Sequence, residues 1–405
     1  MVIRKKYIEA IEPFLGKPVI KVISGVRRCG KSTLMQQLIE RLVSRGVARG
    51  SIVYINKELY EFDHIRNYAD LHDYYKFKTK GAGNRNYLFV DEIQEIAEWE
   101  RCINSLFAEG MTDIVITGSN ASLLSSELAT FLTGRYVEFR IGTLSFKEFC
   151  VLFSASRPGH TSQHLFDLYV KFGGFPGIHH MEWDETVIRQ YLHSIYSTIL
   201  LKDVVVRKDI RDAQLLEQLG EFLIDNSGKI TTSKSISDYI RSQRRKVAVE
   251  TVQSYLNYFT EAMLFNKVRR LDIRGKRLLE TFEKYYPCDP GLRFAVLGYT
   301  PRYLASQLET VVYLELISLG YEVYIGKADE FEVDFVAEKG DKRIYIQVCA
   351  TLGDPATTER EYRSLEQIPD HYPKMIMSLD SGFETSGSGI MWMNIIDFLT
   401  VRELP

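Results

Sequence analysis

A glycine-rich octapeptide constrains the fold of this chain more than any other part of its sequence. The run Gly25-Val26-Arg27-Arg28-Cys29-Gly30-Lys31-Ser32 fits the pattern G-x-x-x-x-G-K-S/T. It follows the β-branched run 20–24 and opens a helical pattern at Lys31, so strand, loop and helix come in the order that a phosphate-binding loop requires. The alternative is a glycine-rich turn with a surface lysine. The motifs that follow along the chain favour the phosphate-binding loop.

The residue types in this loop suit a nucleotide phosphate. The glycines let the backbone curl so that its N–H groups point at a phosphate, and the helix N-terminus adds a positive dipole. We expect Lys31 to reach the β- and γ-phosphates and Ser32 to coordinate Mg²⁺. Oxidation of Cys29 is a separate hypothesis for blocking the site, beside its interpretation as a small apolar filler. The residues expected to bind ATP are Gly25, Val26, Arg27, Arg28, Cys29, Gly30, Lys31, Ser32 and Thr33.

An apolar strand that ends in two carboxylates follows about sixty residues later. In Tyr87-Leu88-Phe89-Val90-Asp91-Glu92, Asp91 is expected to hold the Mg²⁺ shell and Glu92 to orient and polarise the attacking water. The alternative is a buried strand before a helix whose acidic first turn suits the helix dipole. The run 51–56 is predicted to be a further strand, which lies between the other two in sequence. It suits the P-loop subclass that inserts a strand between them and uses a glutamate after the Mg²⁺ aspartate.

Two further roles around the γ-phosphate have candidate residues. The buried strand 114–117 ends in polar residues, of which Thr117, Ser119 or Asn120 would sense the γ-phosphate; the alternative is that Ser119 or Asn120 caps a helix that starts near Ala121. Arg135 is the arginine that would stabilise transition-state charge, in cis or in trans. An ordinary surface arginine is the equal alternative.

Composition limits the remaining choices. A chain of 405 residues, with 45% hydrophobic and 26% charged residues, predicts two to three folded domains, and its net charge of -2 excludes a polycation. Five scattered cysteines form no disulfide or zinc pattern. The sequence contains no apolar stretch of the ~18 residues that span a bilayer. We therefore expect a cytoplasmic protein without a membrane partner.

Several strings together resemble a known family. They are the octapeptide with its strand, Phe89-Val90-Asp91-Glu92-Ile93-Gln94, Ile116-Thr117-Gly118-Ser119-Asn120, Thr133-Gly134-Arg135, Gly173-Gly174-Phe175-Pro176 and Glu332-Val333-Asp334-Phe335. This family joins an AAA-type P-loop ATPase domain to a C-terminal domain of unknown function that resembles restriction endonucleases. The resemblance covers essentially the whole chain and implies an ATPase core, a winged-helix-like middle and a nuclease-like end.

The middle of the chain is basic. Residues 228–286 carry a balance of +7, and helices 233–243 and 248–262 flank the turn Arg244-Arg245-Lys246. A hairpin, 265–270 with 278–285, follows in the order of a winged helix, with Ser233 or Ser235 as the first helix cap. Contacts to double-stranded DNA would come from Arg244, Arg245, Lys246, Arg274 and Lys276. The alternative is a structural or dimerisation element.

The end of the chain has the order of a nuclease centre without its full chemistry. Restriction-endonuclease-like folds gather Mg²⁺ and a lysine with a helix acid, a strand Asp and an E-x-K strand. Here Glu309 and Asp334 are present, but Gln347 replaces the second carboxylate and Cys349 replaces the lysine. We therefore expect a degenerate site in an inactive domain.

The sequence thus predicts an α/β chain with four parts. They are an AAA-type P-loop ATPase core with a parallel sheet (1–150), a helical lid or linker (151–210), a winged-helix-like domain (211–287) and a restriction-endonuclease-like domain (288–405). The expected function is Mg²⁺-dependent ATP hydrolysis that drives a conformational change, coupled or not to DNA. The alternatives are a nucleotide-controlled DNA-binding switch with negligible turnover and, more weakly, a metal-dependent nuclease. An oligomer is compatible with the sequence but not required by it.

Overall fold

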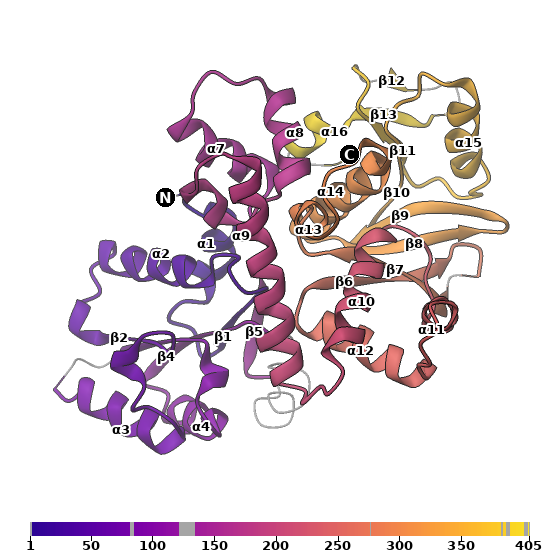
Figure 1. Cartoon of the computed structure of the whole chain (residues 1–405). Helices are drawn as coiled ribbons and strands as arrows, with labels where there is room; N and C mark the ends of the chain where they lie inside the picture. Colours follow the sequence, from indigo (N-terminus) through magenta and orange to yellow (C-terminus); the bar gives the residue numbers. More distant parts are fainter. Residues whose placement is uncertain are drawn as a thin grey trace. The chain divides into compact units, whose positions relative to one another are not determined.

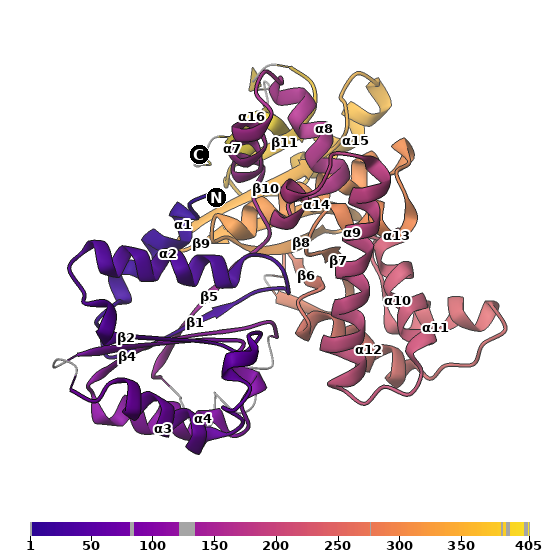
Figure 2. The ribbon, with the colours of Figure 1, turned by 60° about the vertical axis from the view of Figure 1, so that its left-hand side comes forward.

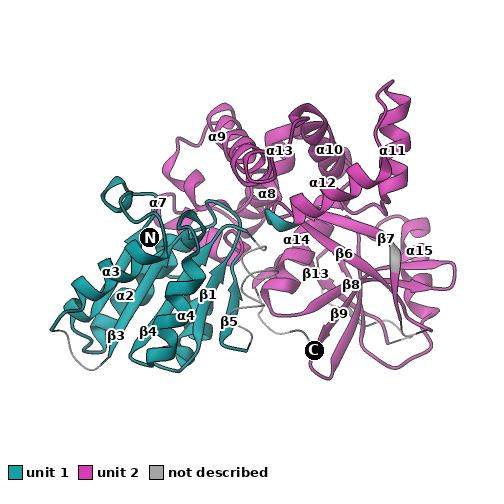
Figure 3. Cartoon of the chain, turned by 90° about the horizontal axis from the view of Figure 1, so that it is seen from below, with its two compact units in different colours: residues 1–141, 261–263 teal, residues 142–260, 264–405 magenta. Residues whose placement is uncertain are grey.

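The computed structural model describes residues 2–81, 85–120, 134–275, 277–381, 384–385, 389–400 and 404, with the backbone alone at 280, 281, 384 and 385. The chain divides into two compact units (Figure 3). Unit 1 comprises residues 1–141 and 261–263, and unit 2 comprises residues 142–260 and 264–405. Each unit has its own sheet.

Unit 1 is built on a five-stranded parallel sheet with the strand order β2-β3-β4-β1-β5. All its strands run the same way, so their carboxyl ends meet at one edge. The strands are β1 (Ile20–Ser24), β2 (Ile52–Asn56), β3 (Asn86–Asp91), β4 (Thr112–Gly118) and β5 (Tyr136–Arg140). Because β1, β3 and β4 are covered on both faces, their sequences are nearly continuous apolar runs.

Helices cover both faces of this sheet (Figure 2): α2 lies on one face, and α3 and α4 lie on the other. The apolar face of α2 buries Leu34, Leu38 and Leu42 at helical spacing. α3 begins at an Asn67 capping box, and α4 begins at Trp99. The helices are α1 (Lys5–Ile11), η1 (Glu12–Phe14), α2 (Lys31–Ser44), η2 (Arg49–Ser51), η3 (Tyr60–Phe62), α3 (Tyr68–Lys78), η4 (Ile93–Glu95) and α4 (Trp99–Glu109).

The strand order agrees with the expected parallel P-loop sheet. The strand that separates the P-loop strand β1 from β3 in space is β4, whereas the predicted strand 51–56 forms β2 beside β3 at the edge. Sequence order therefore did not give the spatial order, because crossover helices let consecutive strands skip positions.

Unit 2 begins with helices. Its first part contains α7 (Phe146–Ser156), α8 (Ser162–Phe172), η5 (Pro176–His180), α9 (Glu185–Thr198), η6 (Ile199–Val206) and α10 (Ala213–Asp225). η6 is a π-helix that continues α9 directly, so the two make one long rod (Figure 1). The helices α11 (Ser233–Ser242) and α12 (Val249–Glu261) follow. The cap of α11 is Thr232, not Ser233 or Ser235, and Ser235 closes a capping box with it.

An eight-stranded sheet forms the rest of unit 2, with the order β12-β13-β11-β10-β9-β8-β6-β7. Its strands are β6 (Phe265–Asp272), β7 (Arg277–Pro287), β8 (Glu322–Ala328), β9 (Phe331–Lys339), β10 (Lys342–Val348), β11 (Lys374–Ser378), β12 (Glu384–Thr385) and β13 (Met391–Asn394). The helices along it are α13 (Gly291–Leu297), η7 (Pro301–Tyr303), α14 (Leu304–Ser318), α15 (Pro355–Glu366) and α16 (Ile395–Thr400).

The predicted wing hairpin belongs to this sheet. β6 pairs with β7 antiparallel and with β8 parallel, so one sheet contains strands of both the predicted winged-helix region and the predicted last domain. The order of two helices and a hairpin agrees with the expected elements, but the division into four domains stays a prediction. None of the helices in the described ranges is long and apolar enough to cross a membrane.

Candidate functional site

The glycine-rich loop joins β1 to α2 at the carboxyl edge of the unit 1 sheet, and both of its glycines are required by the backbone. Gly30 has φ +105°, a backbone conformation that glycine adopts freely and that is strained for a residue with a side chain. A Cβ at Gly25 would lie 2.5 Å from the carbonyl oxygen of Ile141. Along the loop Val26 and Cys29 are buried, Arg27 lies 3.4 Å from Glu58, Arg28 is exposed, and Ser32 and Thr33 are half-buried.

A buried arginine supports this loop from outside the motif. The Arg4 Nη1 donates to the Cys29 carbonyl oxygen at 3.1 Å, and Arg4 is itself buried. The Cys29 side chain is fully buried, and burial raises the pKa of its thiol. A buried, protonated thiol is a poor target for oxidation, so this geometry counts against the redox hypothesis and favours the filler interpretation.

Lys31 lies under the loop. Its Nζ donates to the carbonyl oxygens of Gly25 at 3.1 Å and Val26 at 3.4 Å, and it lies 3.2 Å from Glu92 Oε1. The side chain is only 4% exposed. Burial lowers its pKa, but the charge and hydrogen bond of Glu92, together with the charges of Cys29 and Asp91, outweigh burial and raise it. Lys31 is therefore a cation held between the loop and the end of β3.

The predicted Mg²⁺ ligands come together. Ser32 lies beside the buried Asp91 carboxylate, and the Thr117 hydroxyl donates to Asp91 Oδ1. Burial raises the pKa of Asp91, and the neighbouring Ser32 and Thr117 hydroxyls oppose that shift. A carboxylate and a hydroxyl at the end of the loop form the hard oxygen donor set that Mg²⁺ prefers, so the residues fit this ion.

Glu92 has a strained backbone and a fixed side chain. Its φ of 55° lies in the left-handed region, which is uncommon for a residue with a side chain. Its N–H donates to Thr117 Oγ1 at 3.0 Å, and Gln94 Nε2 donates to its carboxylate. Burial would raise the pKa of Glu92, but the Lys31 charge and the Gln94 hydrogen bond outweigh burial and lower it. Glu92 is therefore an ionised carboxylate beside Lys31.

The three sensor candidates have different surroundings. Thr117 links Asp91 and Glu92 through its hydroxyl, so it acts on the site through them. Ser119 and Asn120 are buried where β4 ends, and the Ser119 hydroxyl has no hydrogen-bond partner among the described residues. The helix that either would cap lies outside the described residues. The sensor assignment of Asn120 stays a prediction.

Arg135 does not lie at the nucleotide edge. Its backbone carbonyl accepts from the Ile20 N–H at the start of β1, whereas the loop follows the end of β1. Its guanidinium donates to Asn104 on α4 at 2.6 Å and lies over the Phe107 ring. A role in cis is therefore wrong for this structure, because the strand register puts Arg135 at the opposite edge of the sheet. A role in trans stays a prediction.

The residues predicted to contact DNA are only partly available. Arg245 makes a two-pronged ion pair with Asp212, with its Nη2 2.5 and 2.6 Å from the carboxylate oxygens, and Arg274 pairs with Asp329 at 2.6 Å. Arg244 and Lys246 are exposed and have no ion-pair partner within the described parts of the chain. Lys276 lies outside the described residues. Local pairing thus neutralises part of the +7 balance.

The predicted degenerate nuclease site is brought together only in part. Glu309 on α14 and Asp334 on β9 share contacts with Lys284 of β7. Gln347 donates to Glu361 at 2.6 Å and accepts from the Asp334 N–H. Cys349 belongs to a separate apolar cluster. Sequence reasoning missed Lys284 and Arg4, and only the pairing of distant elements reveals either.

Comparisons with known proteins agree with this geometry. Residues 17–150 match the model of an AAA domain, and residues 163–303 match a domain of unknown function, DUF8612. An uncharacterized protein of Haemophilus influenzae is 37% identical over 98% of both chains. Uncharacterized protein MJ1544 of Methanocaldococcus jannaschii is 30% identical over 90% of this chain and 83% of its own length.

Among solved structures, the Walker-type ATPase PABY2304 of Pyrococcus abyssi matches 73% of this chain and 96% of its own, with a TM-score of 0.51 and 15% identity, which indicates a shared fold. The likeness to the two uncharacterized relatives covers most of each chain. The chain therefore belongs to the family of the Haemophilus influenzae protein and MJ1544, and its residues 17–150 are an AAA domain with the P-loop NTPase fold.

Proposed function

We propose that this chain binds ATP with Mg²⁺ at residues 25–33 and hydrolyses it. The observation that carries the proposal is the meeting of four side chains at one edge of a parallel sheet. Lys31 pairs with Glu92 at 3.2 Å, and Ser32 lies beside Asp91. This set combines a phosphate-binding ammonium, two metal ligands and a general base.

Each side chain has a separate task in the proposed reaction. The loop N–H groups and Lys31 bind the phosphates, and Ser32 with Asp91 would hold Mg²⁺, which neutralises phosphate charge when bound. Glu92 accepts a hydrogen bond from the attacking water and so orients it toward the γ-phosphate. Thr117 fixes the position of the Glu92 backbone relative to the Asp91 carboxylate, because its hydroxyl is hydrogen-bonded to both.

A nucleotide-controlled switch with negligible turnover is the second candidate. It is favoured by the Lys31–Glu92 pair, because a γ-phosphate that binds Lys31 competes with Glu92 for the same ammonium. Exchange of these partners would change the end of β3 whether or not hydrolysis follows.

One experiment separates the two functions. Purified wild-type protein, Lys31→Ala and Glu92→Gln are compared for binding of a fluorescent ATP analogue and for phosphate release in excess Mg²⁺. The ATPase proposal expects turnover in the wild type alone and binding in both the wild type and Glu92→Gln. Binding without turnover in the wild type would leave the switch. Unchanged binding in Lys31→Ala would exclude both.

A further inference from the structure

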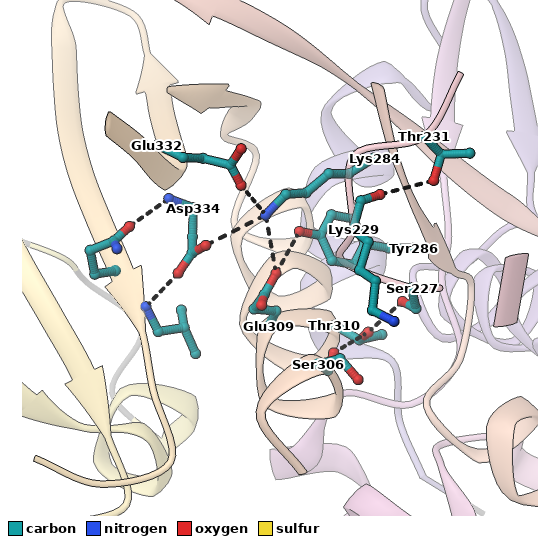
Figure 4. Close-up of polar contacts among 12 residues, drawn as sticks. Ser227, Lys229, Thr231, Lys284, Tyr286, Ser306, Glu309, Thr310, Glu332 and Asp334 are labelled. Atoms are coloured by element: carbon teal, nitrogen blue, oxygen red, sulfur yellow. Dashed lines mark hydrogen bonds and ion pairs between the residues drawn. The ribbon is translucent and has the colours of Figure 1, made fainter. Parts of the chain in front are cut away.

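A cluster of one buried lysine and three partly buried acids lies in unit 2, where the sequence predicted a degenerate nuclease site. The ammonium of Lys284 points between the carboxylates of Glu309, Glu332 and Asp334 (Figure 4). Its Nζ lies 3.5, 2.9 and 3.5 Å from the nearest oxygen of each, in that order. The Lys284 side chain is 3% exposed. One ammonium group thus forms ion pairs with three acids from two different elements, α14 and β9.

The carboxylates in this cluster have other partners that fix their orientation. Asp334 Oδ2 accepts from the Val348 N–H at 2.9 Å, while its Oδ1 faces Lys284. Glu309 Oε2 accepts from the Tyr286 hydroxyl at 3.0 Å and faces Lys284 as well. Glu332 divides its oxygens between Lys284 and Arg270. The oxygens that face the centre of the cluster therefore converge on the ammonium.

These residues do not fit a divalent cation. Mg²⁺ requires near-octahedral oxygen ligands at about 2.0–2.1 Å, and the space among these carboxylates holds the ammonium instead. Gln347, at the position of the second acid, is held by the Asp334 N–H and by Glu361. Across the described ranges, the structure has no group of three acidic, histidine or cysteine side chains arranged to hold a metal ion.

A loop also lies against the cluster. A Cβ on Gly228, which has φ +78°, would lie 2.8 Å from Glu309 Oε2, so the backbone approaches this carboxylate closely. The Ser227 hydroxyl is hydrogen-bonded to Thr310 on α14, and Thr231 exchanges two backbone hydrogen bonds with Glu283 on β7. The segment 227–231 is thus anchored at both of its ends, and its Gly228 lies against Glu309.

Electrostatics explains why a cation must be present. Three carboxylates close together and partly removed from water repel one another, and burial of an unpaired charge is costly. Lys284 supplies the compensating charge from the chain itself, without release of a metal and without dependence on metal concentration. The buried Lys284 ammonium lies where a cation bound by these acids would lie, and it has the same charge sign.

We propose that the Lys284 ammonium occupies the place of a divalent cation, so that the nuclease-like centre is a metal-independent internal ion cluster that ties β7 to α14 and β9. The cluster binds no metal while Lys284 is present. Removal of the ammonium leaves three converging carboxylates, which are the ligands that a divalent cation prefers. Lys284→Ala should therefore create a metal site that the wild type lacks.

Mn²⁺ alone, without nucleotide, tests this proposal on the full-length chain. Calorimetry counts the Mn²⁺ ions bound by the wild type, by Lys284→Ala, by Lys284→Ala/Glu309→Gln and by the control Lys267→Ala. Lys267 is a suitable control because it pairs with Glu283, the neighbour of Lys284 on β7. Weak binding at the phosphate loop is common to all four proteins. We expect one additional Mn²⁺ per chain and a higher Tm with Mn²⁺ in Lys284→Ala alone.

Two results would overturn the proposal. The first is a folded Lys284→Ala protein that binds no more Mn²⁺ than the wild type. The second is a wild type whose Mn²⁺ stoichiometry falls by one in Asp334→Asn, because a metal would then already occupy the centre. The second comparison does not require Lys284→Ala to fold. Equal stoichiometry in the wild type and Asp334→Asn is the result that the proposal predicts.

Discussion

The Nζ of Lys31 lies 3.2 Å from Oε1 of Glu92, and both side chains are nearly buried. The residue expected to bind phosphate and the residue expected to activate water are therefore partners of one another in this structure. In the proposed function, ATP would have to break this ion pair to reach Lys31. Its phosphate would then replace the Glu92 carboxylate and leave that carboxylate available to a water molecule.

Replacement of Glu92 by glutamine should strengthen ATP binding. The amide carries no charge to compete with the γ-phosphate for Lys31, so we expect a several-fold lower Kd for ATP. Glu58→Gln is the matched control, because Glu58 pairs with the loop residue Arg27 near the surface. Fluorescence titration with an ATP analogue measures both variants. A weaker Kd in Glu92→Gln would mean that the pair supports the site instead of competing with the nucleotide.

Thr117→Val should reduce turnover without a comparable loss of binding. The Thr117 hydroxyl bonds both the Asp91 carboxylate and the Glu92 N–H, whereas the loop itself holds the phosphates. Loss of these buried hydrogen bonds should lower the free energy of unfolding by about 1–3 kcal/mol. Thr117→Ser keeps the hydroxyl and should retain activity. Wild-type turnover in Thr117→Val would show that the hydroxyl does not position the acids.

Binding to duplex DNA, which stays a prediction, should depend on Arg244 and Lys246 and not on Arg245. The first two are exposed, whereas Arg245 is committed to Asp212. If both contact phosphates, their joint replacement by alanine should reduce the slope of log affinity against log salt by about 2. Arg245→Ala should leave that slope unchanged. The same salt slope in both variants would place the DNA contact elsewhere or remove it.

Stability should fall as the pH rises because of Asp289. This buried carboxylate accepts from the Gly174 and Gly291 N–H groups, and burial raises its pKa to about 6. The folded state therefore holds the proton more tightly than the unfolded state. Its contribution is complete below about pH 4 and is lost by about pH 6, a loss of about 3 kcal/mol.

Urea unfolding of the wild type and Asp289→Asn across pH 4 to 7 isolates this contribution. The variant has no titrating group at this position. The free energy of unfolding of the wild type, relative to that of Asp289→Asn, should therefore fall as the pH rises from 4 to 6. A difference that is constant across this range would show that Asp289 has a similar pKa in both states.

Local patterns in the sequence predicted the positions of single strands and of the phosphate-binding loop, because neighbouring residues decide these features. The strands around Val90 and Ile116 and the strand predicted at 51–56 are found within one or two residues of their predicted ends, because apolar runs are short-range signals. The octapeptide likewise predicted the strand–loop–helix around Lys31, because the motif itself encodes that turn.

Contacts between distant elements were not predictable in the same way. Register places Arg135 beside Ile20, at the wrong edge for a role in cis, and no local pattern specifies that register. Lys284 looks like any strand lysine until α14 and β9 bring their acids to it. The charge count over residues 228–286 likewise did not include Asp212 and Asp329, because both lie outside that segment. These two aspartates pair with Arg245 and Arg274.

Phosphate release from ATP in single-turnover conditions tests the central claim most directly. With enzyme in excess over radiolabelled ATP and with Mg²⁺ present, the wild type should convert bound ATP to ADP. Glu92→Gln should retain ATP and cleave it about 10²–10⁴-fold more slowly. Equal cleavage rates in the two proteins, or no cleavage by the wild type, would contradict the assignment of Glu92 as the base of an ATPase.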